Sequence, residues 1–196
     1  LKSTDSDEKE KAIKSIMEGG GPTRFLLVQT LGNEDPELAQ MCLFLLLEMK
    51  QDAKEDLLIG MSSTQEEVRW KCCFAMEKLN DPSVISELIK FLDVETANRN
   101  RIRMVSLYLN LIEEPIAQWA LIQAMKSEDR VIRKMAHKRM ILKQKDLEFD
   151  PSASLKIRSQ QIIVWEERWK SIHPNVKVPE YSVKTSEDSV TEDQNQ

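Results

Sequence analysis

The stretch VRWKCCFAM at residues 68–76 decides the fold, because three similar stretches occur elsewhere in the chain. They read LAQMCLFLL at 38–46, IRMVSLYLN at 102–110 and IRKMAHKRM at 132–140. The first residue is aliphatic in every copy, and arginine follows it in three of the four. The fifth position always holds a small residue: Cys42, Cys72, Ser106 and Ala136. A repeat of this length predicts a stack of similar structural units.

Each of these stretches follows a leucine-led segment. The four segments are LVQTL at 27–31, LLIGM at 57–61, LIKFL at 88–92 and LIQAM at 121–125. Apolar residues at i, i+1 and i+4 suit one face of a helix rather than a strand. The step from the leading leucine to the next aliphatic residue is longer in the third unit, which indicates an insertion near residues 96–101.

Five Gly, seven Pro and 6% aromatic residues fit long helices joined by short turns. We therefore predict an all-α fold, an α-solenoid of helical hairpins in one domain over residues 7–172. A single short hairpin cannot bury both of its apolar faces, so it covers them with the next hairpin. The small residue then lets neighbouring helices approach closely, and the cysteines act as small apolar side chains. The predicted units are 22–50, 53–80, 82–112 and 114–143.

Both ends of this stack are predicted to be covered by a capping helix. The first covers residues 7–18 and ends at the glycines that follow it. The second covers residues 152–172, where Trp165 and Trp169 stand one turn apart and are expected to hold the helix on the fourth unit. Residues 173–196 are polar and are predicted to be a disordered tail.

The pattern aliphatic-Arg-x-x-small over residues 22–143 resembles HEAT repeats, specifically the short bacterial type called HEAT-like or phycobilisome-lyase-like repeats. The resemblance implies that the second helix of each unit lines the concave side of the solenoid. It also implies that the repeated arginine, here Arg69, Arg103 and Arg133, pairs with an acidic turn residue of an adjacent unit. The resemblance is specific for architecture and says little about activity.

The net charge of −5 is unevenly distributed along the chain. Residues 19–98 hold 7 Lys/Arg and 14 Asp/Glu, a balance of −7, whereas residues 99–172 hold 15 and 9, a balance of +6. Two histidines and three cysteines at small positions offer no metal-ligand spacing. Gly19–Gly21 lacks the Lys-Ser/Thr of a phosphate-binding loop. We therefore expect neither catalytic residues, nor a metal, nor a cofactor.

The stretch from Arg130 to Lys145 is strongly basic in its first part and predicts the binding surface. The candidate binding residues are Arg130, Arg133, Lys134, His137, Lys138 and Arg139. The leading hypothesis is a non-enzymatic scaffolding module that binds a protein or peptide, with an acidic partner at the basic residues. Two alternatives stay open: nucleic-acid binding through the second helix of unit four, and an enzyme of the bilin-lyase kind, which only the resemblance suggests.

The longest apolar run, Met41–Leu47, is far too short to span a bilayer. The chain starts with Leu1 rather than Met, which indicates that a segment precedes it in the full-length product. A signal or anchor in that segment would place the domain outside the cytoplasm, so both a cytoplasmic and an exported location stay open. The partner, the process and the oligomeric state are not encoded in any motif.

Overall fold

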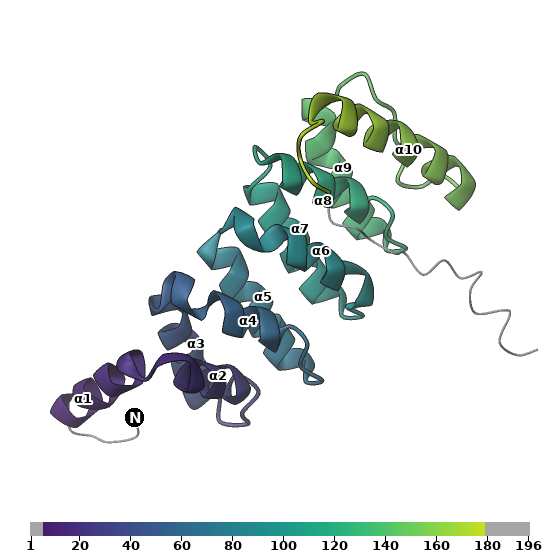
Figure 1. The fold of residues 1–196 in the computed structure, drawn as a ribbon. Coiled ribbons are helices and arrows are strands. Elements are labelled where there is room, and N and C mark those ends of the chain that lie inside the picture. The colour runs from purple at the N-terminus through teal and green to yellow at the C-terminus, as the bar shows by residue number, and fades with distance from the viewer. Residues whose placement is uncertain (1–5, 179–196) are drawn as a thin grey trace, which may run out of the picture.

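The computed structural model describes residues 6–178, and all regular secondary structure in this range is helical (Figure 1). The prediction of an all-α protein is confirmed. The α-helices are α1 (Ser6–Glu18), α2 (Gly20–Thr30), α3 (Pro36–Glu48), α4 (Lys54–Gly60), α5 (Glu66–Leu79), α6 (Ile85–Val94), α7 (Asn98–Asn110), α8 (Pro115–Ala124), α9 (Arg130–Lys143) and α10 (Leu155–Ile172). Short 3₁₀ turns, η1 (Lys50–Ala53) and η2 (Pro82–Val84), precede α4 and α6.

The helices are arranged in four consecutive pairs: α2 with α3, α4 with α5, α6 with α7, and α8 with α9. Apart from the first two residues of α2, each pair lies within one of the four unit ranges that the sequence suggests. Second helices contact one another in the order α3, α5, α7, α9, and the first helices α2 and α4, and α6 and α8, also pack together. In Figure 1 the pairs follow one another in a single direction from α1 to α10. The apolar core runs continuously along this row.

Aspartate and proline residues mark the first turns of several helices. Asp35 and Asp129 precede α3 and α9, and each side chain accepts hydrogen bonds from two backbone N–H groups of the first helical turn. This satisfies donors that have no partner within the helix. The dipeptide Asp-Pro or Glu-Pro places proline in the first turn of α3, η2 and α8, where its missing N–H costs nothing.

Three predicted boundaries differ from the structure. α2 already begins at Gly20, directly after α1, because Gly20 adopts a φ of +67° that glycine allows without strain. The last helix begins at Leu155 rather than at residue 152. Residues 173–178, assigned to the tail, lie against the core through the half-buried Val176 and Val178. Residues 179–196 of the predicted tail lie outside the described range.

The register of the third pair also differs from the prediction. The burial pattern of α7 matches that of α5 when Met104, not Ser106, is aligned with Cys72. In this register Asn100 occupies the position of the aliphatic Val68. The prediction that a small residue stands wherever neighbouring helices approach closely is therefore wrong for the third unit. There Met104 is buried and Ser106 is only half-buried. A methionine fits there because its flexible side chain fills irregular gaps.

Close approach is clearest where α2, α4 and α5 meet. A Cβ atom placed on Gly60 of α4 would lie 2.5 Å from Sγ of Cys72 and 2.6 Å from Cγ1 of Val28. These distances are well inside van der Waals contact, so only glycine fits at this point. Cys72 and Val28 are fully buried. The small residue at position 72 thus serves helix packing, as the sequence suggests.

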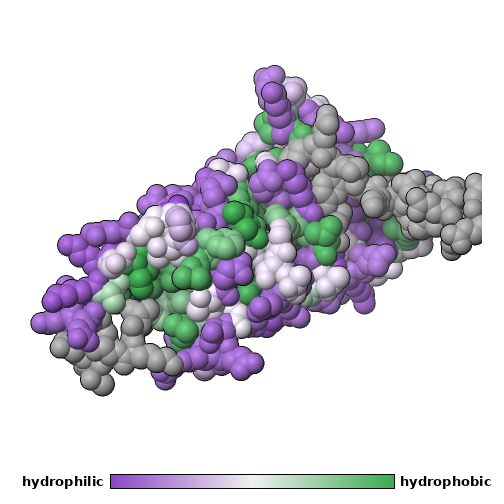
Figure 2. All heavy atoms as spheres, turned by 60° about the horizontal axis from the view of Figure 1, so that its bottom comes forward, coloured by the Kyte–Doolittle hydropathy of each residue, from purple (hydrophilic) through white to green (hydrophobic). Residues whose placement is uncertain are grey.

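The outer surface is mainly hydrophilic. Figure 2 shows one face of the molecule, on which patches of hydrophobic side chains lie between hydrophilic ones along the middle of the face. Every helix within residues 6–178 is too short or too polar to cross a bilayer.

Candidate binding surface

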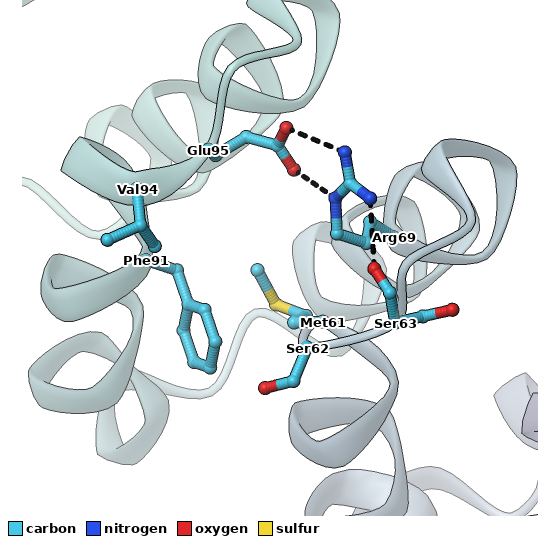
Figure 3. Close-up of a pocket in the computed structure, with 7 residues that line it drawn as sticks. All are labelled: Met61, Ser62, Ser63, Arg69, Phe91, Val94 and Glu95. Atoms are coloured by element: carbon cyan, nitrogen blue, oxygen red, sulfur yellow. Dashed lines mark hydrogen bonds and ion pairs between the residues drawn. The ribbon is translucent and has the colours of Figure 1, made fainter.

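The repeated arginine of the second unit is part of the framework. Arg69 Nη1 donates hydrogen bonds to the backbone oxygens of Ser63 and Thr64, 2.9 and 3.1 Å away, and so holds the turn before its own helix. Its Nε and Nη2 donate to the two carboxylate oxygens of Glu95, at the end of α6, at 2.8 and 3.2 Å (Figure 3). This arginine therefore pairs with an acidic turn residue of the adjacent unit, as the HEAT resemblance implies.

Glu95 is only 6% exposed, and both of its carboxylate oxygens accept hydrogen bonds. Besides Arg69, the amide Nδ2 of Asn100 and the backbone N–H of Ala97 donate to it, each at 2.8 Å. Burial alone would raise the pKa of Glu95, but these hydrogen bonds outweigh it and lower the pKa below its usual value. The carboxylate therefore stays ionised inside the junction between the second and third pairs.

A cavity of about 400 Å³ adjoins this ion pair. Its lining residues are Met61, Ser62, Ser63, Arg69, Phe91, Val94 and Glu95 (Figure 3). The two charged groups on its wall point toward each other and bind each other rather than the open space. Both charged groups on the wall are therefore already paired, and the cavity offers no free charge to a ligand.

The same arginine role recurs at Arg133, which the sequence places among the candidate binding residues. Arg133 is buried, and its Nη1 donates to the backbone oxygens of Ser127 and Glu128 at 2.8 and 2.6 Å. Its Nε donates to the Pro151 oxygen at 2.9 Å. In the third unit Arg101 takes this place and bonds the Ser127 hydroxyl. Arg133 is therefore buried and holds turns together, so it does not lie on the exposed basic surface where the sequence places it.

Arg103 is predicted to occupy this repeated position. In the structure it lies instead on the half-buried surface of α7. It forms an ion pair with Glu77 of α5 at 2.6 Å. Its guanidinium also lies over the rings of Phe74 and Trp70, 4.8 and 5.4 Å from their centroids. Trp70 and Phe74 stack on each other at 5.9 Å and are half-buried. These two rings form an aromatic patch, which interrupts the charged surface of the second helices.

His137 also does not belong to the exposed basic surface. Its ring meets Phe149 and Trp165 edge-on, with centroids 5.2 and 6.2 Å apart, and its buried Nε2 has no hydrogen-bond partner. Burial lowers the pKa of His137, and the nearby Asp150 carboxylate only partly opposes this shift. The main cause of the lowered pKa is therefore burial beneath α10.

This burial predicts a pH dependence of stability. The unfolded chain takes up a proton at His137 near pH 6.5, whereas the folded chain resists it because the folded pKa is lower. The stability from neutral His137 is therefore present above about pH 6.5 and is lost as the pH falls toward the folded pKa. We expect urea unfolding to show that His137→Gln loses less stability than the unchanged protein between about pH 7.5 and 5.5. Equal losses would contradict this assignment.

The remaining four candidates lie on the exposed side of α9. Arg130 donates a hydrogen bond to the Ser152 hydroxyl at 2.6 Å. Lys134, Lys138 and Arg139 are exposed, and none of the three forms an ion pair or hydrogen bond with another residue in the range 6–178. Several other cations of the second helices are neutralised by a carboxylate, for example Arg103 by Glu77. The exposed side of α9 therefore carries uncompensated positive charge.

Equivalent positions along the row place these lysines on the same side as the aromatic patch. In the register set by burial, Lys134 and Lys138 of α9 correspond to Trp70 and Phe74 of α5. Because α5, α7 and α9 pack side by side, equivalent residues lie on the same side of the row. We call this side the ladder face. Its exposed or half-buried residues are Trp70, Phe74, Ile102, Arg103, Ser106, Lys134 and Lys138.

Metal ligands and thiols are the remaining reactive groups within residues 6–178. No group of three or more His, Cys, Asp or Glu side chains in residues 6–178 is placed to hold a metal ion. Burial raises the pKa of Cys72 and raises that of Cys73 to about 12, so both thiols stay protonated at neutral pH. The chemistry on the surface is charge and apolar contact.

Comparison with known proteins adds no function. No known protein family, curated protein or solved structure matches this chain. The assignment of a function therefore depends on the geometry of the ladder face.

Proposed function

We propose that this chain is an α-solenoid of the HEAT type whose ladder face binds an extended acidic segment of a protein partner. The observation that carries the proposal is the uncompensated charge of Lys134 and Lys138 in line with the aromatic patch on α5. The regular contacts between successive second helices support the solenoid part of the proposal.

The chemistry of the ladder face selects the kind of partner. Two lysines one helical turn apart attract carboxylates without competition from an acid on α9, which contains none. Trp70 and Phe74 supply a partly exposed apolar surface of the type enriched at binding sites. A segment that carries acidic residues at one end and an apolar or aromatic side chain at the other matches this order. Long-range attraction to such a segment is screened by salt.

A peptide-binding experiment tests this proposal. The probe is a fluorescently labelled peptide with a glutamate-rich half and a half that contains leucine and phenylalanine, followed by fluorescence anisotropy at low and moderate salt. We expect Lys134→Glu combined with Lys138→Glu to weaken binding about tenfold or more, which corresponds to about 1.4 kcal/mol. The control variant reverses Lys50 and Lys156, which are exposed and lie on η1 and α10, outside the ladder face.

The control changes the net charge equally, so it separates local contact from overall charge. Equal weakening by both variants, or no binding of the peptide by the unchanged protein, would rule out the ladder face as an acidic-peptide site. A gel shift of DNA at low salt that Lys134→Glu and Lys138→Glu abolish would favour nucleic acid instead. We expect no such shift, because residues 19–98 carry a balance of −7 that would repel a polyanion along half of the row.

A further inference from the structure

A wide apolar groove lies at the N-terminal end of the row, between α1 and α3. It encloses about 800 Å³. Its lining residues are Ile13, Pro36, Glu37, Gln40, Met41 and Phe44. Phe44 is 50% exposed, although it is one of the largest apolar side chains of α3.

The opposite end carries a matching apolar stripe on α10. Trp165 and Trp169 are buried on one side of this helix. Ile157, Val164 and Ile172 stand on another side, at spacings near two helical turns, and are 48%, 50% and 47% exposed. About half of the surface of each of these three side chains is left uncovered by the rest of residues 6–178.

Terminal units of a helical stack normally present a polar outer side, because nothing follows to cover it. Here both ends present apolar side chains, and the two ends differ in charge. The half that bears the groove has a balance of −7 over residues 19–98, and the half that bears the stripe has +6 over residues 99–172. Glu37 lies on the groove wall, while the exposed Lys156 stands next to Ile157 on the helix that bears the stripe.

We propose that the groove binds α10 of a second copy of this chain. The Ile157, Val164 and Ile172 stripe of one copy enters the α1–α3 groove of the next, an amphipathic helix in an apolar groove. The opposite charges of the two halves favour this head-to-tail orientation over a symmetric contact between identical ends, which would bring like charges together. The contact is heterologous, so every assembly keeps one free groove at one end and one free stripe at the other, and it grows with concentration.

The test uses two complementary variants, each of which blocks one side of the contact. Phe44→Glu damages the groove and leaves the stripe intact, and Val164→Glu does the reverse. Both side chains are half-exposed, so we expect normal helix content and unfolding temperature, checked by circular dichroism. Sedimentation velocity over a concentration series measures the mass. Phe25→Glu is the control, since Phe25 is similarly exposed on α2 and lies outside the groove lining.

The unchanged protein and Phe25→Glu are expected to form dimers and larger species as concentration rises toward about 1 mM, and less so at high salt. Each blocking variant alone is expected to stay monomeric. An equal mixture of the two is expected to form a one-to-one dimer and nothing larger, because only one intact groove and one intact stripe can meet. A monomeric unchanged protein, blocking variants that still associate alone, or a mixture that stays monomeric would each overturn the proposal. If either glutamate variant unfolds, Phe44→Gln and Val164→Gln replace it under the same criteria.

Discussion

Replacement of Glu95 by alanine is expected to lower the free energy of unfolding by about 3–5 kcal/mol, because it leaves a largely buried guanidinium without its counter-charge. Arg69 donates two hydrogen bonds to Glu95, and its side chain is only 18% exposed. Asn100, which is fully buried, loses its acceptor at the same time. Urea unfolding at neutral pH, followed by circular dichroism, measures the loss.

A matched control shows whether burial causes this effect. Glu87 forms a 2.8 Å ion pair with Lys90, but both side chains are about half-exposed. We expect Glu87→Ala to change the free energy of unfolding by no more than about 0.5 kcal/mol. A similar small loss for Glu95→Ala would mean that the Arg69–Glu95 pair does not hold the second and third helix pairs together.

The effect of Glu95 should also depend on pH in a defined direction. Its folded pKa is lowered, so its contribution is complete above the unfolded value of about 4.3. The contribution is lost as the pH falls through the lower folded pKa. The difference in stability between the unchanged protein and Glu95→Ala should therefore shrink in strongly acidic solution.

The helical class and the pairing of helices could be predicted because apolar periodicity and turn residues are local signals. The register of the third pair could not be read from the same pattern. Between residues 100 and 110 the apolar residues fit two helical stripes about equally well. The choice was decided by a buried polar network, in which Asn100 replaces an aliphatic residue and bonds Glu95. One signal was present, since Arg69, Arg101 and Arg133 are equally spaced in the sequence.

The candidate site was predicted only in part, for a reason that helical geometry explains. Ile132, Ala136 and Met140 mark the buried stripe of α9, and Arg133 and His137 each follow a member of this stripe by one residue. Lys134 and Lys138 lie a further step around the helix and reach solvent. A division of the basic stretch by helical periodicity would have separated the two groups. The cover over His137 could not be foreseen, because it comes from residues 144–154 and from α10.

The cap over α8 and α9 depends strongly on Trp165. This side chain is 1% exposed, and its Nε1 donates a hydrogen bond to the Glu148 oxygen at 3.1 Å. Trp169 acts beside it, with its Nε1 bonded to the Pro115 oxygen and its ring 5.0 Å from that of Trp119 on α8. The prediction that these two tryptophans hold the last helix on the fourth unit is confirmed.

Trp165→Ala is therefore expected to cost about 3–5 kcal/mol, as for other buried aromatic residues whose removal leaves a cavity. In a row of units that contact only their neighbours, the loss should fall mainly on the C-terminal end. We expect amide hydrogen exchange to accelerate in α10 and α8 while α3 and α5 keep most of their protection. Ile163→Ala, at a half-exposed position of the same helix, should change stability by about 0.5 kcal/mol or less. Uniform acceleration from α3 to α10 would show instead that the whole row unfolds as one unit, and that the cap is part of a single cooperative core.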